Sequence, residues 1–491
     1  MAYAVTLARG LTWLHDGADG GDLIAAAASG GVAHPPGYPA YLVLARLFLL
    51  LPFGSPALRT NLLSAASAVG ASLLVADAVR LAHGGRHRIG AAAGVLAGFA
   101  FGLSPLLWSQ AVITEVYGLH ALLVAASLRA LPVWPGTQNS LKAFAFWGAI
   151  TGIALANHLT SIFLVPAGLG LALFGRACPE LAEGSGRRMH SLAGAGIGLA
   201  AGVALYALLP LWASRHPAIN WGNASTGSGF WWLVTGEPYR GLVFQAWPYL
   251  WSRLQAGAGL WVEQFGAVGL VAGLSGLLIT NRQPVVLRWI LLWLFLCFSV
   301  FAIGYNTSDS YTYLLPAFLA FAIWLGQGLA IWLEAAGSWQ RVLTALFIVA
   351  LFFNAVPAMA RVDASRDDTA ERFGRAVLEG APPGAIIITS EDRDSFALWY
   401  WREAAGARRD LIVVVERLLP FDWYRDQLRW TYPDVQLAPG SGARPGTGWA
   451  DELIRLNDRP VCRTFPDQNE VLICDSLLKP ASDRLERIAS A

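Results

Sequence analysis

The chain has 491 residues, of which 55% are hydrophobic and only 14% are charged. Soluble globular domains have about a quarter of their residues charged, so this composition excludes an ordinary soluble protein and indicates a membrane protein. The formal net charge of +2 gives no basis for nucleic-acid binding.

Two acidic residues stand near the start of the first polar segment. Asp19 and Asp22 precede the alanine-rich stretch LIAAAAS, and their separation of three residues puts them on one face of a helix. In one interpretation Asp19 caps this helix and Asp22 stabilises its first turn. In the other the two carboxylates belong to a functional site. The interpretations are compatible, because a capping carboxylate keeps one oxygen free.

The sequence HPPGYP follows at residues 34–39. It cannot be helical, because each residue before a proline is pushed toward an extended conformation. This rigid segment either ends one helix and starts the next, or holds His34 and Tyr38 in place over a lipid headgroup. Residues 40–52 have Arg46 in their middle and are too few to span a bilayer, so we expect them to lie on its surface.

Apolar segments of the length needed to cross a bilayer, about 17–25 residues, or slightly shorter, then recur along the chain. We expect spans at residues 61–81, 90–108, 116–132, 143–157, 160–175, 191–212, 257–280, 289–305, 312–333 and 341–358.

Polar residues interrupt this pattern at several points. Glu115 lies between two spans and is costly if it meets lipid, so it should face a cavity or a partner. His158 separates two other spans and is either a packing residue or a ligand. Residues 213–256 form a tryptophan-rich loop, which includes Trp221 and Arg240 and is expected to follow the water–lipid boundary.

The composition changes near residue 360, so the chain divides into a membrane domain, residues 1–360, and a soluble domain, residues 361–491. The runs AIIITS and LIVVVE read as buried parallel strands, with helices at about 366–380 and 395–405. We therefore expect a small α/β domain. Cys462 and Cys474 can form a disulfide there if this domain is extracytoplasmic.

The basic residues of the short loops predict the orientation, because cytoplasmic loops are richer in Lys and Arg. One set of alternate loops has eleven such residues: Arg80, Arg86, Arg88, Arg129, Lys142, Arg176, Arg187, Arg188, Arg282, Arg288 and Arg341. The other has six: Arg9, Arg46, Arg59, Arg215, Arg240 and Arg253. This makes residues 9–60, the tryptophan-rich loop and the C-terminal domain extracytoplasmic. The unusual polar residues then gather on that same side, which indicates a site there.

The segments that carry these residues resemble a known family. "GADGGDLIAAAASGGVAHPPGYPAYLVLARLFLLLPFGSPALRTNLLSA", "LWSQAVITEVYGLHALL", "GIALANHLTSIFLVP" and "LLPLWASRHPAINWGNASTGSGFWWLVTGEPY" are similar to motifs of the prokaryotic relatives of the transmembrane O-mannosyltransferase that modifies plexin-type receptor domains. That family, once catalogued as a domain of unknown function, belongs to the GT-C glycosyltransferases. The resemblance covers about residues 10–330. A full transmembrane helix is expected before the first loop, yet only eight residues precede Arg9.

The resemblance implies a polytopic α-helical membrane protein of GT-C fold that uses a sugar on a polyprenyl phosphate. Asp19 matches the first acidic position of the family's loop motif, and Asp22 the second, where many relatives have Glu. Glu115 matches the acid of the second extracytoplasmic loop. We expect Asp19 and Asp22 to be catalytic. The residues expected to bind substrate are His34, Tyr38, Glu115, His158, Trp221 and Arg240.

The expected function is inverting transfer of a mannose-like sugar to an acceptor hydroxyl, with a carboxylate as general base, at the outer face of the plasma membrane. The partners are the lipid-linked donor, a protein or glycan acceptor and membrane lipid, with no nucleic acid. No cofactor or metal is expected, although the three acids could bind a divalent ion. The alternatives are a transporter or flippase of lipid-linked sugars and a non-catalytic carbohydrate-binding scaffold. The C-terminal domain is expected to influence acceptor choice and to carry no chemistry.

Overall fold

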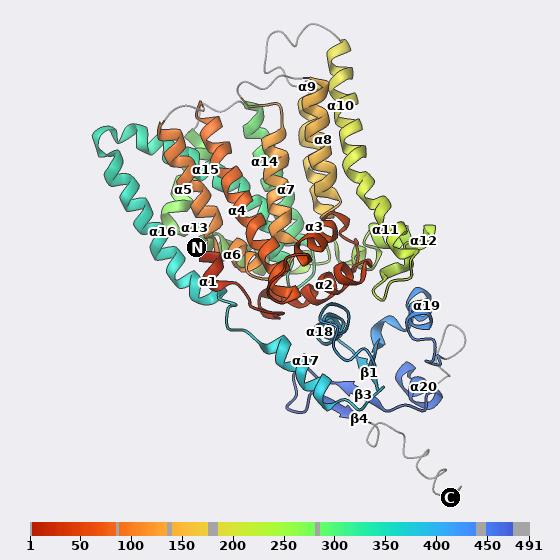
Figure 1. Ribbon diagram of the computed structural model, residues 1–491. Helices are drawn as coiled ribbons and strands as arrows, with labels where there is room; N and C mark the ends of the chain where they lie inside the picture. The colour runs from red at the N-terminus through yellow and green to blue at the C-terminus, as the bar shows by residue number, and fades with distance from the viewer. Residues whose placement is uncertain are drawn as a thin grey trace, which may run out of the picture.

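The computed structural model describes residues 2–84, 88–134, 140–174, 185–279, 285–437 and 448–474. A bundle of long helices forms one part of the molecule, and a smaller α/β domain lies against one end of the bundle (Figure 1). The predicted fold class, a polytopic helical protein with a C-terminal α/β domain, is confirmed.

Successive long helices of the bundle run alternately toward and away from the C-terminal domain, while the short helices α6 and α11 follow α5 and α10 at the end near that domain (Figure 1). They are α4 (Pro56–Ala82), α5 (Arg88–Gly102), α6 (Pro105–Ala111), α7 (Tyr117–Ala130), α8 (Leu141–Leu155), α9 (Leu164–Phe174), α10 (Ser185–Val203), α11 (Leu208–Ala213), α13 (Leu250–Ile279), α14 (Val285–Gly304), α15 (Leu315–Ala335) and α16 (Gln340–Val362). Helix α15 is the centre of the bundle, since 94% of its most apolar window is buried.

The end of the bundle far from the C-terminal domain is tied together by charges. Asp77 of α4 binds both Arg80 and Arg129, and His83 lies 2.9 Å from Glu334 at the end of α15. Arg80 and Arg129 belong to the basic set predicted to be cytoplasmic. The predicted two-sided division of the described loops therefore agrees with the architecture, whereas Arg86, Arg176 and Arg282 lie outside the described residues.

The predicted spans all contain helix, but not all form one full-length span in the described residues. Six segments are long and apolar enough to cross a membrane: Pro56–Ala82, Arg188–Ala213, Trp247–Ile279, Val285–Gly304, Ser310–Ala335 and Gly337–Val362. The span predicted at 90–108 is broken, because α5 and α6 meet at a bend of 66°. Ser104-Pro105 explains this break, since a proline ends the preceding helix and starts a new one. Helices α7 and α9 have 14 and 11 residues and are shorter than predicted, whereas α8 has the predicted length of 15 residues.

Short elements form a layer between the bundle and the C-terminal domain (Figure 1). They are α1 (Ala2–Thr6), α2 (Gly20–Ser29), α3 (Pro39–Leu49) and α12 (Gly227–Val234). Helix α3 stays at this end of the bundle, as predicted for residues 40–52, and it exposes Leu47 and then Leu50 beyond its last turn. Arg46 turns inward, donates to the carbonyl of Gly31 at 2.8 Å and lies over the ring of Trp212.

The C-terminal domain is built on a four-stranded sheet of order β2-β1-β3-β4. The strands are β1 (Ile386–Thr389), β2 (Ile412–Val415), β3 (Val461–Thr464) and β4 (Leu472–Cys474), and the helices are α17 (Thr369–Gly380), α18 (Asp392–Trp399), α19 (Asp422–Thr431) and α20 (Trp449–Leu456). Strand β1 pairs in parallel with both β2 and β3, and β4 is antiparallel to β3. The two predicted strands are thus correct in position and direction.

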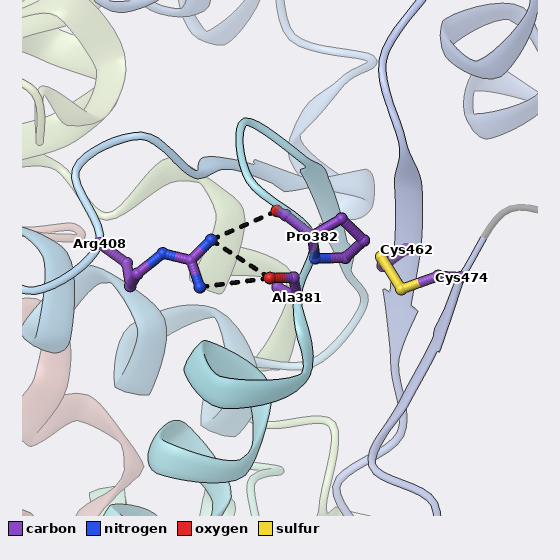
Figure 2. The surroundings of a disulfide bond; sticks show 5 residues. All are labelled: Ala381, Pro382, Arg408, Cys462 and Cys474. Carbon is purple, nitrogen blue, oxygen red and sulfur yellow. Dashed lines mark hydrogen bonds between the residues drawn. A yellow bond between two sulfur atoms is a disulfide. The ribbon is translucent and has the colours of Figure 1, made fainter.

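The predicted disulfide between Cys462 and Cys474 joins β3 to β4 (Figure 2). On the other side of β1, Arg408 donates to the carbonyls of Ala381 and Pro382, which anchors the turn that enters the strand. Cys297 is a free thiol, and Cys178 lies outside the described residues.

The C-terminal domain packs directly on α2. A Cβ atom at Gly21 would collide with the backbone carbonyl of Phe396 in α18, so only glycine allows this contact. The tryptophan-rich loop joins the same interface, because the ring of Trp221 contacts those of Trp399 and Trp423. Consequently, the domain and the first loop form one continuous packed unit.

Candidate active site

A cavity of about 750 Å³ lies where the bundle, the first loop, the tryptophan-rich loop and the C-terminal domain meet. It is lined by Trp13, Asp16, Ala18, Asp19, His34, Pro35, Pro36, Tyr38, Tyr117, His158, Leu159, Thr160, Ile162, Phe163, Thr235, Gly236, Tyr239, Arg240, Val243, Phe301, Tyr305, Thr307, Ser308, Asp309, Tyr313, Glu391, Asp392, Arg393 and Arg417. Five of the eight predicted site residues are on this wall. Those five are Asp19, His34, Tyr38, His158 and Arg240.

Asp19 is the last residue of a short 3-10 helix, Leu14–Asp19, which leads directly into α2. Its side chain makes no capping hydrogen bond, so the interpretation of Asp19 as a helix cap is wrong. The reason is that its backbone is already helical, whereas a capping residue needs an extended conformation to reach back to the first amides. The carboxylate is 43% exposed to the cavity, and its Oδ2 lies 3.4 Å from Nε2 of His34.

Asp22 lies behind His34 and is completely buried. Its Oδ2 accepts from the backbone N–H of His34 at 2.9 Å and lies 2.7 Å from Nδ1 of the same residue. Its Oδ1 accepts from Nε1 of Trp221 at 2.9 Å. Both carboxylate oxygens are therefore occupied within the protein, and Asp22 fixes the orientation of the imidazole that faces Asp19.

Asp19 and His34 have shifted pKa values, and the causes of the two shifts differ. Enclosure in the cavity raises the pKa of Asp19 to about 6, and Asp392 adds to this rise, while His34 opposes it. Burial lowers the pKa of His34, but the carboxylates of Asp19 and Asp22 outweigh burial and raise it to about 9. Near neutral pH, Asp19 is thus mostly ionised and His34 is protonated.

His158 faces the cavity from the break between α8 and α9. Its Nδ1 lies 2.8 Å from Oγ1 of Thr160 and accepts from the Thr160 backbone N–H at 3.4 Å. Burial lowers its pKa to about 4, so the ring is neutral near pH 7. With Nδ1 accepting, Nε2 carries the hydrogen and can donate to a ligand.

Three predicted site residues are not on the cavity wall: Asp22, Glu115 and Trp221. These three residues are therefore not placed to contact a substrate in the cavity. Glu115 is 4% exposed, and its Oε2 accepts from the backbone N–H of Val116 at 3.2 Å. Burial and the nearby Asp19 raise the pKa of Glu115 well above its usual value. Trp221 is turned toward Asp22 instead of the cavity.

Several wall residues escaped the sequence analysis. Tyr239, Tyr305 and Tyr313 belong to the wall, and no signal distinguished them from the other aromatic residues. Asp392 and Arg417 come soon after the two strands predicted in the C-terminal domain. Ligands bind at the carboxyl ends of parallel strands, so that rule could have singled out both residues.

The described residues contain no group of three or more His, Cys, Asp or Glu side chains placed to hold a metal ion. The acids on the wall instead lie near hydroxyl or basic groups. Tyr311 donates to Asp16 at 2.5 Å, and Tyr117 donates to Asp309 at 3.2 Å.

Solved structures share this architecture. ArnT from Cupriavidus metallidurans, bound to undecaprenyl phosphate, matches 98% of this chain and 97% of its own with a TM-score of 0.59 at 15% identity. The archaeal oligosaccharyltransferase AglB from Archaeoglobus fulgidus, solved with an inhibitory peptide and a dolichol-phosphate, matches 94% of this chain and 66% of its own with a TM-score of 0.51 at 12% identity. The chain therefore has the fold of the GT-C membrane proteins.

Sequence comparison is more specific. The family described as "Protein O-mannosyl-transferase TMEM260 N-terminal domain" matches residues 19–182, and "TMEM260-associated domain 2" matches residues 370–439. The mouse protein O-mannosyl-transferase TMEM260 is 27% identical over 91% of this chain and 65% of its own length. The relative of the same name from Dictyostelium discoideum is 23% identical over 91% of this chain and 60% of its own. The chain thus has a GT-C fold and is similar in sequence to the protein O-mannosyl-transferases named TMEM260, and it spans less than two thirds of the length of these curated relatives.

Proposed function

We propose that this protein is a membrane glycosyltransferase that transfers a mannose-like sugar from a polyprenyl phosphate to an acceptor hydroxyl. The names of its relatives support sugar transfer to protein. The lipid phosphates bound by its structural neighbours support a lipid-linked donor. The orientation predicted from the basic loops puts the reaction at the outer face of the plasma membrane.

The observation that carries the proposal is the chain of contacts from Asp22 through His34 to Asp19 at the cavity wall. A protonated His34 cannot accept a proton, whereas an ionised Asp19 with a raised pKa can. Asp19 is therefore the general base, and His34 holds it in place. Asp22 acts through His34 as a positioning residue.

The reaction follows from these assignments. The acceptor hydroxyl gives its proton to Asp19, and its oxygen forms a bond to the anomeric carbon of the sugar. The bond from that carbon to the phosphate oxygen breaks, and its electron pair leaves with the polyprenyl phosphate. Attack from the face opposite to the phosphate inverts the anomeric configuration. The side chains available to stabilise the leaving phosphate are Arg240, which is exposed at the wall, and the neutral Nε2–H of His158.

The surroundings of the cavity support a lipid-linked donor. Ile162, Phe163 and Phe301 make one side of the cavity apolar. A second pocket of about 470 Å³ lies further along α9 and α14 and is lined by Pro166, Ala167, Gly170, Leu171, Val286, Trp289, Ile290, Leu292, Trp293 and Leu296. An isoprenoid chain that leaves the cavity along these two helices finds an apolar surface.

The proposal is tested with purified protein and a polyprenyl-phosphate mannose that carries label in the sugar. We expect free polyprenyl phosphate and a labelled product of inverted anomeric configuration, with the same rate in the presence of EDTA. Retention of configuration would contradict the single displacement. Movement of intact donor across a vesicle membrane without cleavage would instead support a flippase.

A further inference from the structure

The C-terminal domain turns the carboxyl ends of its parallel strands toward the cavity. Strand β1 ends at Thr389 and is followed by Asp392, and strand β2 ends at Val415 and is followed by Arg417. The two strands are neighbours in parallel register, so these loops emerge at the same edge of the sheet. Both Asp392 and Arg417 line the cavity. The carboxyl edge of a parallel sheet is the usual ligand-binding edge of such domains.

Asp392 and Arg417 are exposed, and no hydrogen bond or ion pair joins either side chain to another described residue. Their neighbour Arg393 is different. It donates to Glu391 at 2.9 Å and to Asp467 at 2.7 Å, and these bonds keep its own loop in place. The cavity thus has a carboxylate and a guanidinium on one wall that are not engaged in holding the fold together.

The position of Asp392 and Arg417 in the cavity indicates whether they contact the donor or the acceptor. The apolar side of the cavity, with Phe163 and Phe301, adjoins the membrane helices from which a lipid-linked donor enters. Asp19 of the first loop lines the same cavity and is close enough to Asp392 of the C-terminal domain for the two carboxylates to interact electrostatically. A displacement with inversion needs the acceptor opposite the leaving phosphate, so the acceptor approaches from the C-terminal domain.

We propose that Asp392 and Arg417 form the acceptor subsite and bind an extended polypeptide segment on both sides of its reactive hydroxyl. A carboxylate accepts from peptide N–H groups, and a guanidinium donates to peptide carbonyls. Trp13 lines the same cavity. A sugar acceptor fits this wall less well, since the ring of Trp13 already has Arg393 over it and Phe373 against it.

This inference rests on the proposed function, and it is tested with donor and acceptor varied separately. The variants are Asp392→Asn and Arg417→Gln. Their matched controls are Asp458→Asn and Arg409→Gln, which alter exposed residues just before β3 and β2, at the opposite edge of the same sheet. The donor is labelled polyprenyl-phosphate mannose, and the acceptor is the envelope fraction of cells that lack the enzyme, separated afterwards into protein, glycan and lipid.

We expect label in protein, and a rise of about 10-fold or more in the acceptor concentration needed for half-maximal transfer by each cavity variant. Donor hydrolysis without acceptor is measured at pH 8, where Asp19 is ionised whether or not Asp392 raises its pKa. Its rate and its dependence on donor concentration should then match the controls, as should thermal stability in detergent. Variants that behave like the controls, variants that lose donor hydrolysis equally, or label confined to glycan or lipid would overturn the inference while leaving the transferase activity in place. A wild-type protein that turns over no donor would overturn the proposed function as well.

Discussion

The candidate site combines three residues that differ in exposure and in proposed role: Asp19, His34 and Asp22. Asp22 is buried with both oxygens hydrogen-bonded, His34 lies between two carboxylates and is mostly buried at the cavity wall, and Asp19 is the most exposed of the three. A buried carboxylate without partners is costly, so the imidazole both satisfies Asp22 and transmits its position to Asp19. The sequence predicts both acids to be catalytic, and their surroundings distinguish the proposed base, Asp19, from the proposed positioning residue, Asp22.

Replacing Asp19 by Asn tests its role as the base. Asn keeps the shape of the side chain but cannot take the proton, so turnover should fall by about 10²-fold or more, with donor binding and melting temperature nearly unchanged. Asp16→Asn is the control, because Asp16 lies on the same wall and an amide can still accept from Tyr311. Loss of turnover in the control together with near-normal turnover in Asp19→Asn would move the base to Asp16.

The pH dependence of kcat/KM should be bell-shaped. The base must be ionised, so the rate rises as pH increases through the pKa of Asp19, about 6. His34 must stay protonated, so the rate falls as pH increases through its pKa, about 9. In Asp22→Asn one of the three carboxylates that raise the pKa of His34 is gone, while Asp19 and Glu115 remain, and the alkaline limb should move to lower pH. The measurement is the initial rate from pH 5 to 10 for the wild-type protein and for Asp22→Asn. If the alkaline limb does not move in the variant, the limb does not report the titration of His34.

At the scale of elements, the contact between α2 and α18 determines the shape of the site. Phe396 of α18 lies parallel to His34 at 6.3 Å between ring centroids, so the C-terminal domain packs against the Asp–His chain itself. Gly21 permits this approach, because any side chain there meets the α18 backbone, which cannot rotate away.

Gly21→Ala should therefore destabilise the protein by about 1–3 kcal/mol and reduce transfer, since the methyl group pushes α18 away from the site. Gly257→Ala is the control, because a Cβ atom there has open space in the helix α13. Ala favours a helix interior over Gly, so the control should be unchanged or slightly more stable. The measurement is the melting curve and the transfer rate of each variant. If Gly21→Ala matches Gly257→Ala in both, the contact between α2 and α18 adjusts to the methyl group without loss.

Helix positions followed from the sequence better than helix lengths did. Hydropathy located every bundle helix, but it averages over a window and cannot register a single bend such as the one before Pro105. Strands β1 and β2 were predictable because buried parallel strands are continuous apolar runs. Strands β3 and β4 were not, because Arg463 interrupts the first and the second has only three residues.

At the scale of the whole molecule, the gathering of polar residues at one end of the bundle followed from counting spans. Asp19, His34, His158 and Arg240 come from segments far apart in the sequence, and the structure brings them to one cavity. The way in which the C-terminal domain docks onto the first loop did not follow. Docking onto α2 depends on the fit of Gly21 to Phe396, and such a fit has no signature in hydropathy or charge.

The same alternation of helices leads to a prediction about topology. The ends of α4 and α7, with Arg80 and Arg129, lie at the end of the bundle opposite the C-terminal domain, so residues 84 and 400 should be on different sides of the membrane (Figure 1). The excess of basic residues puts residue 84 in the cytoplasm. The disulfide between Cys462 and Cys474 is an independent reason to put residue 400 outside, because disulfides persist in oxidising compartments.

Reporter fusions at the two positions and thiol labelling in intact cells check this arrangement together. A periplasm-active reporter should work at residue 400 and fail at residue 84, and Cys462 and Cys474 should react with maleimide only after reduction. Cys297, a free thiol within α14, is the internal control for the reagent in denatured protein. If both reporters indicate one side, the alternation of helices does not describe the inserted protein. If residue 400 is cytoplasmic and both thiols are free, the orientation is reversed, and the cavity with Asp19 faces the cytoplasm.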